Sequence, residues 1–222
     1  MKKTVFFGML AAAFAVVFAF TACLGDDDEN KTKNMSDHEK RLALGNIAGN
    51  YKGKLHFYNP RHLDKRDSLT CDWNLSTYGE FSTNNLPVAF LANYVVEGSK
   101  VQEALDKAAA RPFLATLSPQ QKQSGEGVSM LMCTFLPQSY TLSFTTEYED
   151  VQYNVSLNLL SSLSRQETSG SANYAAISEH VEYNTNVGRL QRMSAFLLLD
   201  KMTVNDQTYP INDYARLVGT KY

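Results

Sequence analysis

Hydrophobic and polar residues alternate with a period of two over much of the chain. The stretches "YKGKLHF" (51–57) and "LTCDWNL" (69–75) show this most clearly in the first third. Successive side chains of a strand point to opposite faces of a sheet, so a period of two indicates a strand with one face buried. Both stretches therefore predict half-buried strands.

The same alternation predicts two hairpins later in the chain. Residues 140–148 carry Tyr, Leu, Phe, Thr and Tyr at every second position, and residues 151–159 carry hydrophobic side chains at every second position. Glu149-Asp150 separates the two stretches as a turn. The run "MSAFLLLDKMTV" predicts a buried strand that turns at Asn205-Asp206 into a short return strand over 207–209. Residues 172–183 are compatible with a weaker strand or a short helix.

Two segments change to helical spacing. Ser36 and Glu39 fit a capping box at the start of a short helix that could end at Gly45. Ser99 and Gln102 begin a second helix, expected over about residues 100–110 and ended by Pro112.

These elements predict an α+β fold that is mainly antiparallel β. We expect a curved sheet, a sandwich or an open barrel, with one or two short helices. Residues 36–222 are long enough for one domain with its own hydrophobic core, and no internal repeat divides them.

The first residues have a different character. Lys2 and Lys3 precede an uncharged apolar run over residues 5–20, which is shorter than the roughly 20 residues that span a bilayer as a helix. Residues 1–22 therefore predict a cleaved signal peptide rather than a permanent anchor.

The segment after this run resembles the processing site of bacterial lipoproteins. Phe20-Thr21-Ala22-Cys23 is similar to a lipobox, with Phe20 where Leu is usual. That resemblance implies cleavage before Cys23, acylation of Cys23 and anchoring in a lipid bilayer. Residues 23–35 would then form a flexible tether.

The tether carries an acidic cluster, Asp26, Asp27, Asp28 and Glu29. This cluster looks like the export signal of Bacteroidetes surface lipoproteins, and the resemblance implies a location on the outer face of the outer membrane. A polar spacer without an address is the alternative.

Charge and cysteine content narrow the partners. The sequence has 21 basic and 23 acidic residues, and loss of Lys2 and Lys3 would leave a formal charge of −4. No basic patch stands out along the chain, so nucleic acid is not an expected partner.

Cys71 and Cys133 both occupy inward strand positions. There they either form a disulfide bridge or remain two inert buried thiols.

No residue pattern predicts catalysis, a metal site or a cofactor. The four histidines, His38, His56, His62 and His180, lack metal-ligand spacing. Neither a G-x-S-x-G turn nor an S-x-x-K pair occurs, and carboxylates such as Glu147 and Glu149 lie beside a hairpin turn.

Tyrosines and one short motif carry the remaining binding hypotheses. Four of the twelve tyrosines could lie on an exposed sheet face and stack against sugars, although half-buried strand positions are the usual place for tyrosine: Tyr148, Tyr153, Tyr174 and Tyr183. Asp67-Ser68-Leu69 matches the O-glycosylation signal of Bacteroidetes, with Ser68 as acceptor.

Several segments together give a whole-chain resemblance. With the tether, "IAGNYKGKL", "DSLTCDWNLST", "NLPVAFLA" and "DKMTVNDQTY", the chain looks like the uncharacterised-domain lipoproteins of gut Bacteroidetes. "GNYKG" is also similar to the first strand of lipocalin-like barrels, without the closing Arg motif of that family. The resemblance implies location and no established activity. We expect a non-enzymatic module that binds a glycan or another envelope protein. A hydrolase of an extracellular polymer and an interaction subunit without its own ligand are the alternatives.

Overall fold

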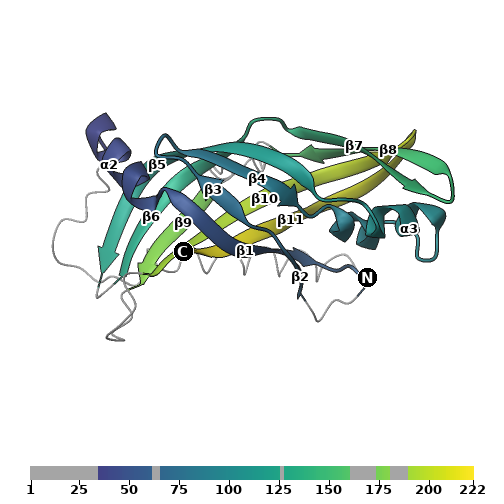
Figure 1. Cartoon of the computed structure of the whole chain (residues 1–222), viewed down its shortest axis with the longest axis horizontal. Coiled ribbons are helices and arrows are strands. Elements are labelled where there is room, and N and C mark those ends of the chain that lie inside the picture. The colour runs from purple at the N-terminus through teal and green to yellow at the C-terminus, as the bar shows by residue number, and fades with distance from the viewer. Residues whose placement is uncertain (1–34, 62–65, 126–127, 161–173, 181–189) are drawn as a thin grey trace, which may run out of the picture. The chain divides into compact units, whose positions relative to one another are not determined.

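The structure is a computed structural model that describes residues 35–61, 66–125, 128–160, 174–180 and 190–222 (Figure 1). Residues 34–222 form one compact unit. The fold is mainly antiparallel β with few short helices, as the alternation predicted.

Eleven strands lie within the described residues. In chain order they are β1 (Gly49–Tyr58), β2 (Arg66–Thr70), β3 (Trp73–Leu75), β4 (Glu80–Leu86), β5 (Arg111–Gly125), β6 (Val128–Pro137), β7 (Thr141–Tyr148), β8 (Val151–Leu159), β9 (Tyr174–His180), β10 (Leu190–Val204) and β11 (Gln207–Lys221). The helices are α2 (Asp37–Ile47), the 3-10 helix η1 (Ala89–Tyr94) and α3 (Lys100–Asp106).

All strands belong to one curled sheet. Its order runs β11-β1-β3-β4-β5-β6-β9-β10-β8-β7, β10 also pairs with β11, and β2 pairs with β1 beside β3. One edge of β10 is shared, because β9 pairs with residues 190–195 and β8 with residues 199–204. A register shift between Leu199 and Lys201 lies within the half that pairs with β8. The sheet is a curled half-barrel that stays open along β7, whose second edge pairs with no described strand.

The concave face of the sheet holds the hydrophobic core. An aromatic cluster lies near its centre, with the Tyr51 ring stacked on Trp73 at 5.7 Å and Phe81 edge-on to Phe135 at 5.2 Å. Trp73 is 3% exposed, which confirms that it is a core residue. Such aromatic pairs add about 0.5–1.5 kcal/mol beyond the burial of their surface.

Two glycines make room for Trp73. Gly53 of β1 and Gly219 of β11 pair directly in register. A Cβ atom built on either glycine would lie 2.5 Å from Cη2 of Trp73. The indole ring therefore lies flat on two neighbouring strands, where any other residue type would push it away.

The predicted hairpins are confirmed. Between β7 and β8, Glu149 and Asp150 have φ values of 50° and 60°, the left-handed geometry of a two-residue hairpin turn. Between β10 and β11 the turn lies at Asn205-Asp206, and Asn205 has φ 51°. The return strand expected over 207–209 is wrong in length, because β11 continues to Lys221 through Pro210 and the left-handed residue Asn212.

The capping boxes place the helix starts correctly and their ends less well. The Ser36 hydroxyl accepts a hydrogen bond from the backbone of Glu39, which begins α2 as predicted. Gly45 does not end α2, which continues to Ile47 because Leu44 and Ile47 both pack in the core. Ser99 caps α3, but α3 ends at Asp106 and Pro112 lies in β5 instead of marking a helix end.

Candidate functional site

A row of hydroxyl side chains crosses four neighbouring strands on the outer face of the sheet. Ser143 of β7 pairs with Ser156 of β8, and Ser156 pairs with Thr203 of β10. Thr203 in turn pairs with Thr208 of β11, and their hydroxyl oxygens are 3.4 Å apart. Since neighbouring strands are about 4.8 Å apart, the row extends over about 14 Å.

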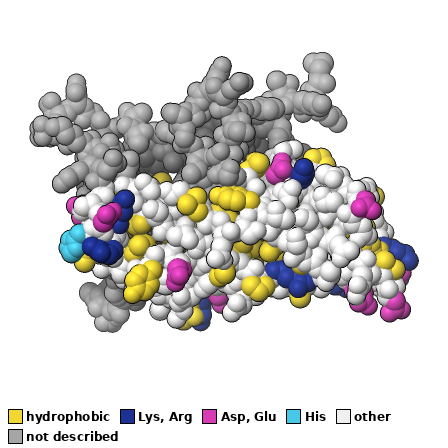
Figure 2. Space-filling model, turned by 90° about the horizontal axis from the view of Figure 1, so that it is seen from above, with side chains coloured by type: hydrophobic (Ala, Val, Ile, Leu, Met, Phe, Trp, Pro, Cys, Tyr) yellow, Lys and Arg dark blue, Asp and Glu magenta, His cyan; other side chains and the backbone are white. Residues whose placement is uncertain are grey.

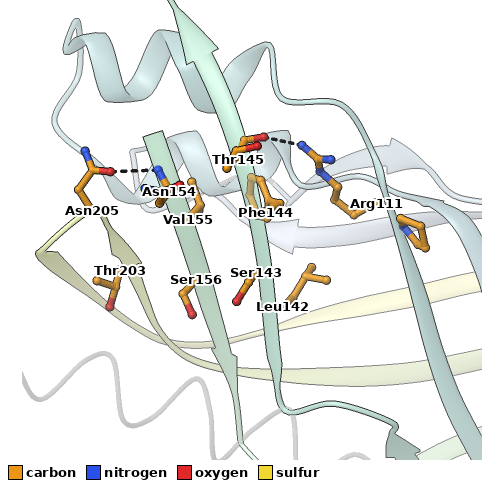
Figure 3. Close-up of a pocket in the computed structure, with 11 residues that line it drawn as sticks. Arg111, Leu142, Ser143, Phe144, Thr145, Asn154, Val155, Ser156, Thr203 and Asn205 are labelled. Atoms are coloured by element: carbon orange, nitrogen blue, oxygen red, sulfur yellow. Dashed lines mark hydrogen bonds between the residues drawn. The ribbon is translucent and has the colours of Figure 1, made fainter. Parts of the chain in front are cut away.

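Amide side chains border this row toward the hairpin turns. Asn154 pairs with Thr145 one step further along β8 and β7. Its backbone N–H donates to Oδ1 of Asn205 at 3.0 Å, and the N–H of Asn205 donates to the Asn154 carbonyl at 2.7 Å. These bonds fix the end of the β7–β8 hairpin against the β10–β11 turn, as Figure 3 shows.

Part of this surface is hollowed into a groove of about 740 Å³, which we call the polar groove. Its eleven lining residues are Arg111, Pro112, Leu142, Ser143, Phe144, Thr145, Asn154, Val155, Ser156, Thr203 and Asn205 (Figure 3). Arg111 is the one charged residue in this lining. Apolar atoms make up more of its lining than polar atoms, and between them the groove offers hydroxyl, amide and guanidinium groups to a polar ligand.

Arg111 forms the wall of the groove on the β5 side. Its Nη2 donates a hydrogen bond to the carbonyl of Thr145 at 2.6 Å, and its guanidinium lies 5.1 Å from the centre of the Phe144 ring. The buried Nε atom has no hydrogen-bond partner within the described residues. An unpaired buried donor costs about 1–3 kcal/mol, so a ligand or water that accepts from it would be favoured.

Sequence reasoning missed this groove, and its signal lay in the polar phase of the alternation. Only the hydrophobic phase of 140–148 and 151–159 was interpreted, as the face that packs in the core. Ser143, Ser156 and Thr203 occupy the opposite phase, where polar side chains are expected simply because water covers them. The register that aligns them joins strands about 50 residues apart, which alternation alone does not specify.

The predicted aromatic ligand face does not form from the two tyrosines whose side chains the structure describes. Tyr153 is 8% exposed, and Tyr148 packs against the core with Nζ of Lys107 4.4 Å from the centre of its ring. Both lie on the inward phase of the hairpin together with Phe144, which explains their burial. Tyr174 begins β9, its side chain lies outside the described part, and Tyr183 lies outside the described residues.

Both strand cysteines are buried and free. Of the two alternatives, the structure thus has two separate thiols and no bridge between Cys71 and Cys133. Burial raises the pKa of the Cys71 thiol to about 11 and that of Cys133 to about 12. Thiols that stay protonated are poor nucleophiles, so neither is suited to covalent catalysis.

The remaining predicted positions are scattered. Ser68 is exposed on β2, opposite His56 of β1, so its hydroxyl is accessible for modification. His38 lies on α2 and His180 ends β9, while His62 lies outside the described residues. Among the described residues, no group of three or more His, Cys, Asp or Glu side chains could hold a metal ion.

The targeting segment lies outside the described residues. This applies to Cys23, to the acidic cluster Asp26, Asp27, Asp28 and Glu29, and to the rest of the tether up to residue 34. No helix in the described ranges is both long and apolar enough to cross a membrane.

Comparison with known proteins identifies a domain family but no activity. No curated protein and no solved structure matches the chain. One domain family does match, over residues 46–191, which takes in the strands from β1 to the start of β10. The chain therefore belongs to the family described as a domain of unknown function, DUF4840.

Proposed function

We propose that the chain is a lipid-anchored, non-enzymatic module of the outer-membrane surface that binds a glycan in the polar groove. The signal peptide, Cys23 and the acidic tether support the location. The observation that carries the binding function is the register of Ser143, Ser156, Thr203 and Thr208 across four strands.

Hydroxyl and amide groups suit a saccharide because each can both donate and accept hydrogen bonds. Fixed on neighbouring strands, these side chains lose little further freedom when a ligand binds, which lowers the entropic cost of binding. The Asn205 side chain accepts from the backbone N–H of Asn154, so this amide at the end of the array is also ordered before binding.

The experiment is a glycan array followed by calorimetry with each glycan that binds. The variant is Ser156→Ala combined with Thr203→Val, which removes two hydroxyls from the centre of the row with little change in shape. We expect affinity to fall by about fivefold to tenfold for each hydrogen bond lost, or roughly 1 kcal/mol.

Thr116→Val is the matched control, because Thr116 is an exposed residue of β5 and does not line the groove. It should leave the affinity unchanged. Equal affinity of the double variant and the unmodified protein for every glycan that binds would reject the polar groove as the site.

An envelope protein is a second candidate partner, favoured by the second edge of β7. This edge pairs with no described strand, and a partner chain could add a strand to it beyond the Thr145 carbonyl, which already accepts from Arg111. Replacing Ser143 with proline would remove a backbone donor from β7 and should abolish co-purification of such a partner in mild detergent. Co-purification that survives this change would exclude strand addition at β7.

A further inference from the structure

A second part of the outer face gathers positive charge. His56 of β1 pairs with Arg216 of β11, and Lys54 lies two residues before His56 on the same face. Arg66 of β2 pairs with Tyr58, and Arg192 of β10 pairs with Thr220. We call this surface the basic face, and its members are Lys54, His56, Arg66, Arg192 and Arg216.

The register explains how residues from distant parts of the sequence meet. Row by row across β2, β1, β11 and β10, Ser68, His56, Arg216 and Phe196 are aligned, and so are Thr70, Lys54, Val218 and Ser194. The third row aligns Lys52, Thr220 and Arg192. No position in these three rows is Asp or Glu. The basic face lies at the opposite end of the β10–β11 pair from the polar groove.

Three cations of this face have no acidic partner at ion-pair distance within the described residues. Within the described part of the chain, Lys54, Arg66 and Arg192 form no ion pair. Asp72 accepts from the N–H of Gly53, and Asp213 accepts from the hydroxyl of Tyr94. Burial raises the pKa of Asp213 and the charge of Arg66 opposes that rise, so Asp213 offsets part of the charge of Arg66. Lys54, Arg66 and Arg192 are also exposed, so an anion can reach them.

The lowered pKa of His56 is separate evidence for positive charge on this face. Burial and then the positive charges of Arg216, Lys54, Arg192 and Arg66 lower the pKa of the imidazole. Four cations from four strands therefore act on a single point of the surface. The mixed surface in Figure 2 contrasts with this, because Lys/Arg and Asp/Glu side chains are interspersed on the face shown there.

Hydroxyl and aromatic groups accompany the charges. Ser68 and Thr70 are exposed on β2, and Nε of Arg216 donates to the hydroxyl of Ser194 at 2.7 Å. The Phe196 and Tyr214 rings lie 5.6 Å apart, beside Arg216. Anion-binding groups interleaved with hydroxyls match a ligand that itself alternates acidic groups and hydroxyls.

Two other polyanionic surfaces fit less well. A bilayer surface favours basic residues flanked by several protruding apolar side chains. Tyr222, whose ring lies 4.6 Å from Nζ of Lys52, is one strongly exposed hydrophobic side chain beside this face, whereas Tyr78, Val96 and Leu42 lie elsewhere. Nucleic acid is the weaker candidate because it is not a constituent of the outer-membrane surface on which the proposed function places the chain.

We propose that the basic face binds an anionic polysaccharide through the carboxylate or sulfate groups of its sugars. Lys54, Arg66 and Arg192 contact these groups, and the hydroxyls of Ser68 and Thr70 bind neighbouring sugar hydroxyls. This site does not depend on the polar groove, so either can fail without the other.

The test uses the detergent-solubilised full chain and three immobilised probes: polygalacturonate, dextran sulfate and neutral dextran. We expect binding to one or both of the charged polymers and none to neutral dextran. Raising the salt to about 1 M should abolish binding, because the Debye length then falls to about 3 Å.

The decisive variant is Lys54→Gln combined with Arg192→Gln, and its control is Lys40→Gln with Arg41→Gln on α2, which makes the same change in net charge. We expect the first to weaken binding of the charged polymer by about tenfold or more and the control by less than about twofold. The groove variant Ser156→Ala/Thr203→Val should leave this binding unchanged. Because Lys54 and Arg192 are exposed, both proteins should fold normally, which thermal unfolding can verify.

The pH dependence gives a further readout. A bound anion favours the protonated imidazole, so affinity should rise as the pH falls from about 7.5 to about 5.5, and His56→Gln should remove that rise. Equal weakening by the two charge variants would overturn the proposal. So would tighter binding of anionic phosphatidylglycerol vesicles or of single-stranded DNA than of both charged polymers.

Discussion

At the scale of single residues, Gly53 and Gly219 show how two paired glycines make room for one large core side chain, Trp73. The absence of side chains on two paired positions lets the indole ring reach the backbone of both strands. The ring thereby fills the concave face where β1 and β11 meet, and its packing depends on a space that only glycine provides.

Gly53→Ala and Gly219→Ala should each destabilise the protein by about 1–3 kcal/mol, because an added methyl group would overlap the Trp73 ring. Urea unfolding followed by tryptophan fluorescence measures this directly. The control is Gly45→Ala, where no atom lies within 4 Å of the new Cβ and the residue lies in α2. It should stabilise by about 0.5–1 kcal/mol. A neutral effect of both strand substitutions would contradict the packing described for Trp73.

The charge of His56 should also affect stability. Its pKa in the folded protein lies below the ordinary value of 6.5, so the unfolded chain binds a proton more readily. The contribution of the neutral imidazole is fully present above pH 6.5 and is lost as the pH falls through the lower folded value. Urea midpoints measured over this range should decline toward acid less steeply for His56→Gln than for the unmodified protein. Parallel profiles would show that neither burial nor the neighbouring cations lower the pKa of His56 in the folded protein.

At the scale of elements, the sequence predicted the presence and type of helices and strands better than the residues at which they end. Capping residues located the starts of α2 and α3, and the two turn pairs located both hairpins, because these signals are local. The ends depended on tertiary contacts. Burial of Ile47 extends α2 beyond Gly45, and pairing with β1 and β10 extends β11 past Pro210 and Asn212, which by themselves suggest a turn.

The β7–β8 turn allows a test of local geometry. Asp150 has φ 60°, which costs a residue with a Cβ atom about 1–2 kcal/mol and costs glycine nothing. Asp150→Gly should therefore raise the free energy of unfolding by about 1 kcal/mol. Gln152→Gly, two positions further in the exposed phase of β8, should lower it by about 0.5–1 kcal/mol. If both substitutions lowered the free energy of unfolding, the left-handed conformation of Asp150 would not be a source of strain.

At the scale of the whole molecule, the fold class could be predicted from the sequence, whereas the two proposed binding surfaces could not. Alternation fixes which face of a strand is buried but leaves open which strands become neighbours. Both the hydroxyl row and the basic face are products of that pairing. Arg66 and Arg216 are 150 positions apart in the chain, so no local charge run announces them. The residues that suggest the proposed anchor, by contrast, form one continuous stretch of sequence and can be recognised without the fold.

The proposed anchor and address can be separated experimentally. Cys23→Ser should release the protein from the membrane fraction, because the acyl chains that hold it would not be attached. Replacement of Asp26, Asp27, Asp28 and Glu29 by alanine should keep the protein membrane-bound but protect it from protease added to intact cells. Labelling with a palmitate analogue measures the first effect and protease accessibility the second. Protease sensitivity that survives the alanine replacement would leave the acidic cluster as a spacer only.

The shared edge of β10 has a consequence for how the fold comes apart. β10 and β11 remain paired from Arg192 and Thr220 to Val204 and Gln207, and the two sections of the sheet attach to different halves of β10. One section continues through β9 and the other through β8, and neither can detach from the β10–β11 pair without exposing core surface of the other. The described fold should therefore unfold as one cooperative unit, with the slowest amide hydrogen exchange along this pair. A module held outside a cell by its N-terminus would thus resist partial opening, the state in which proteases cut.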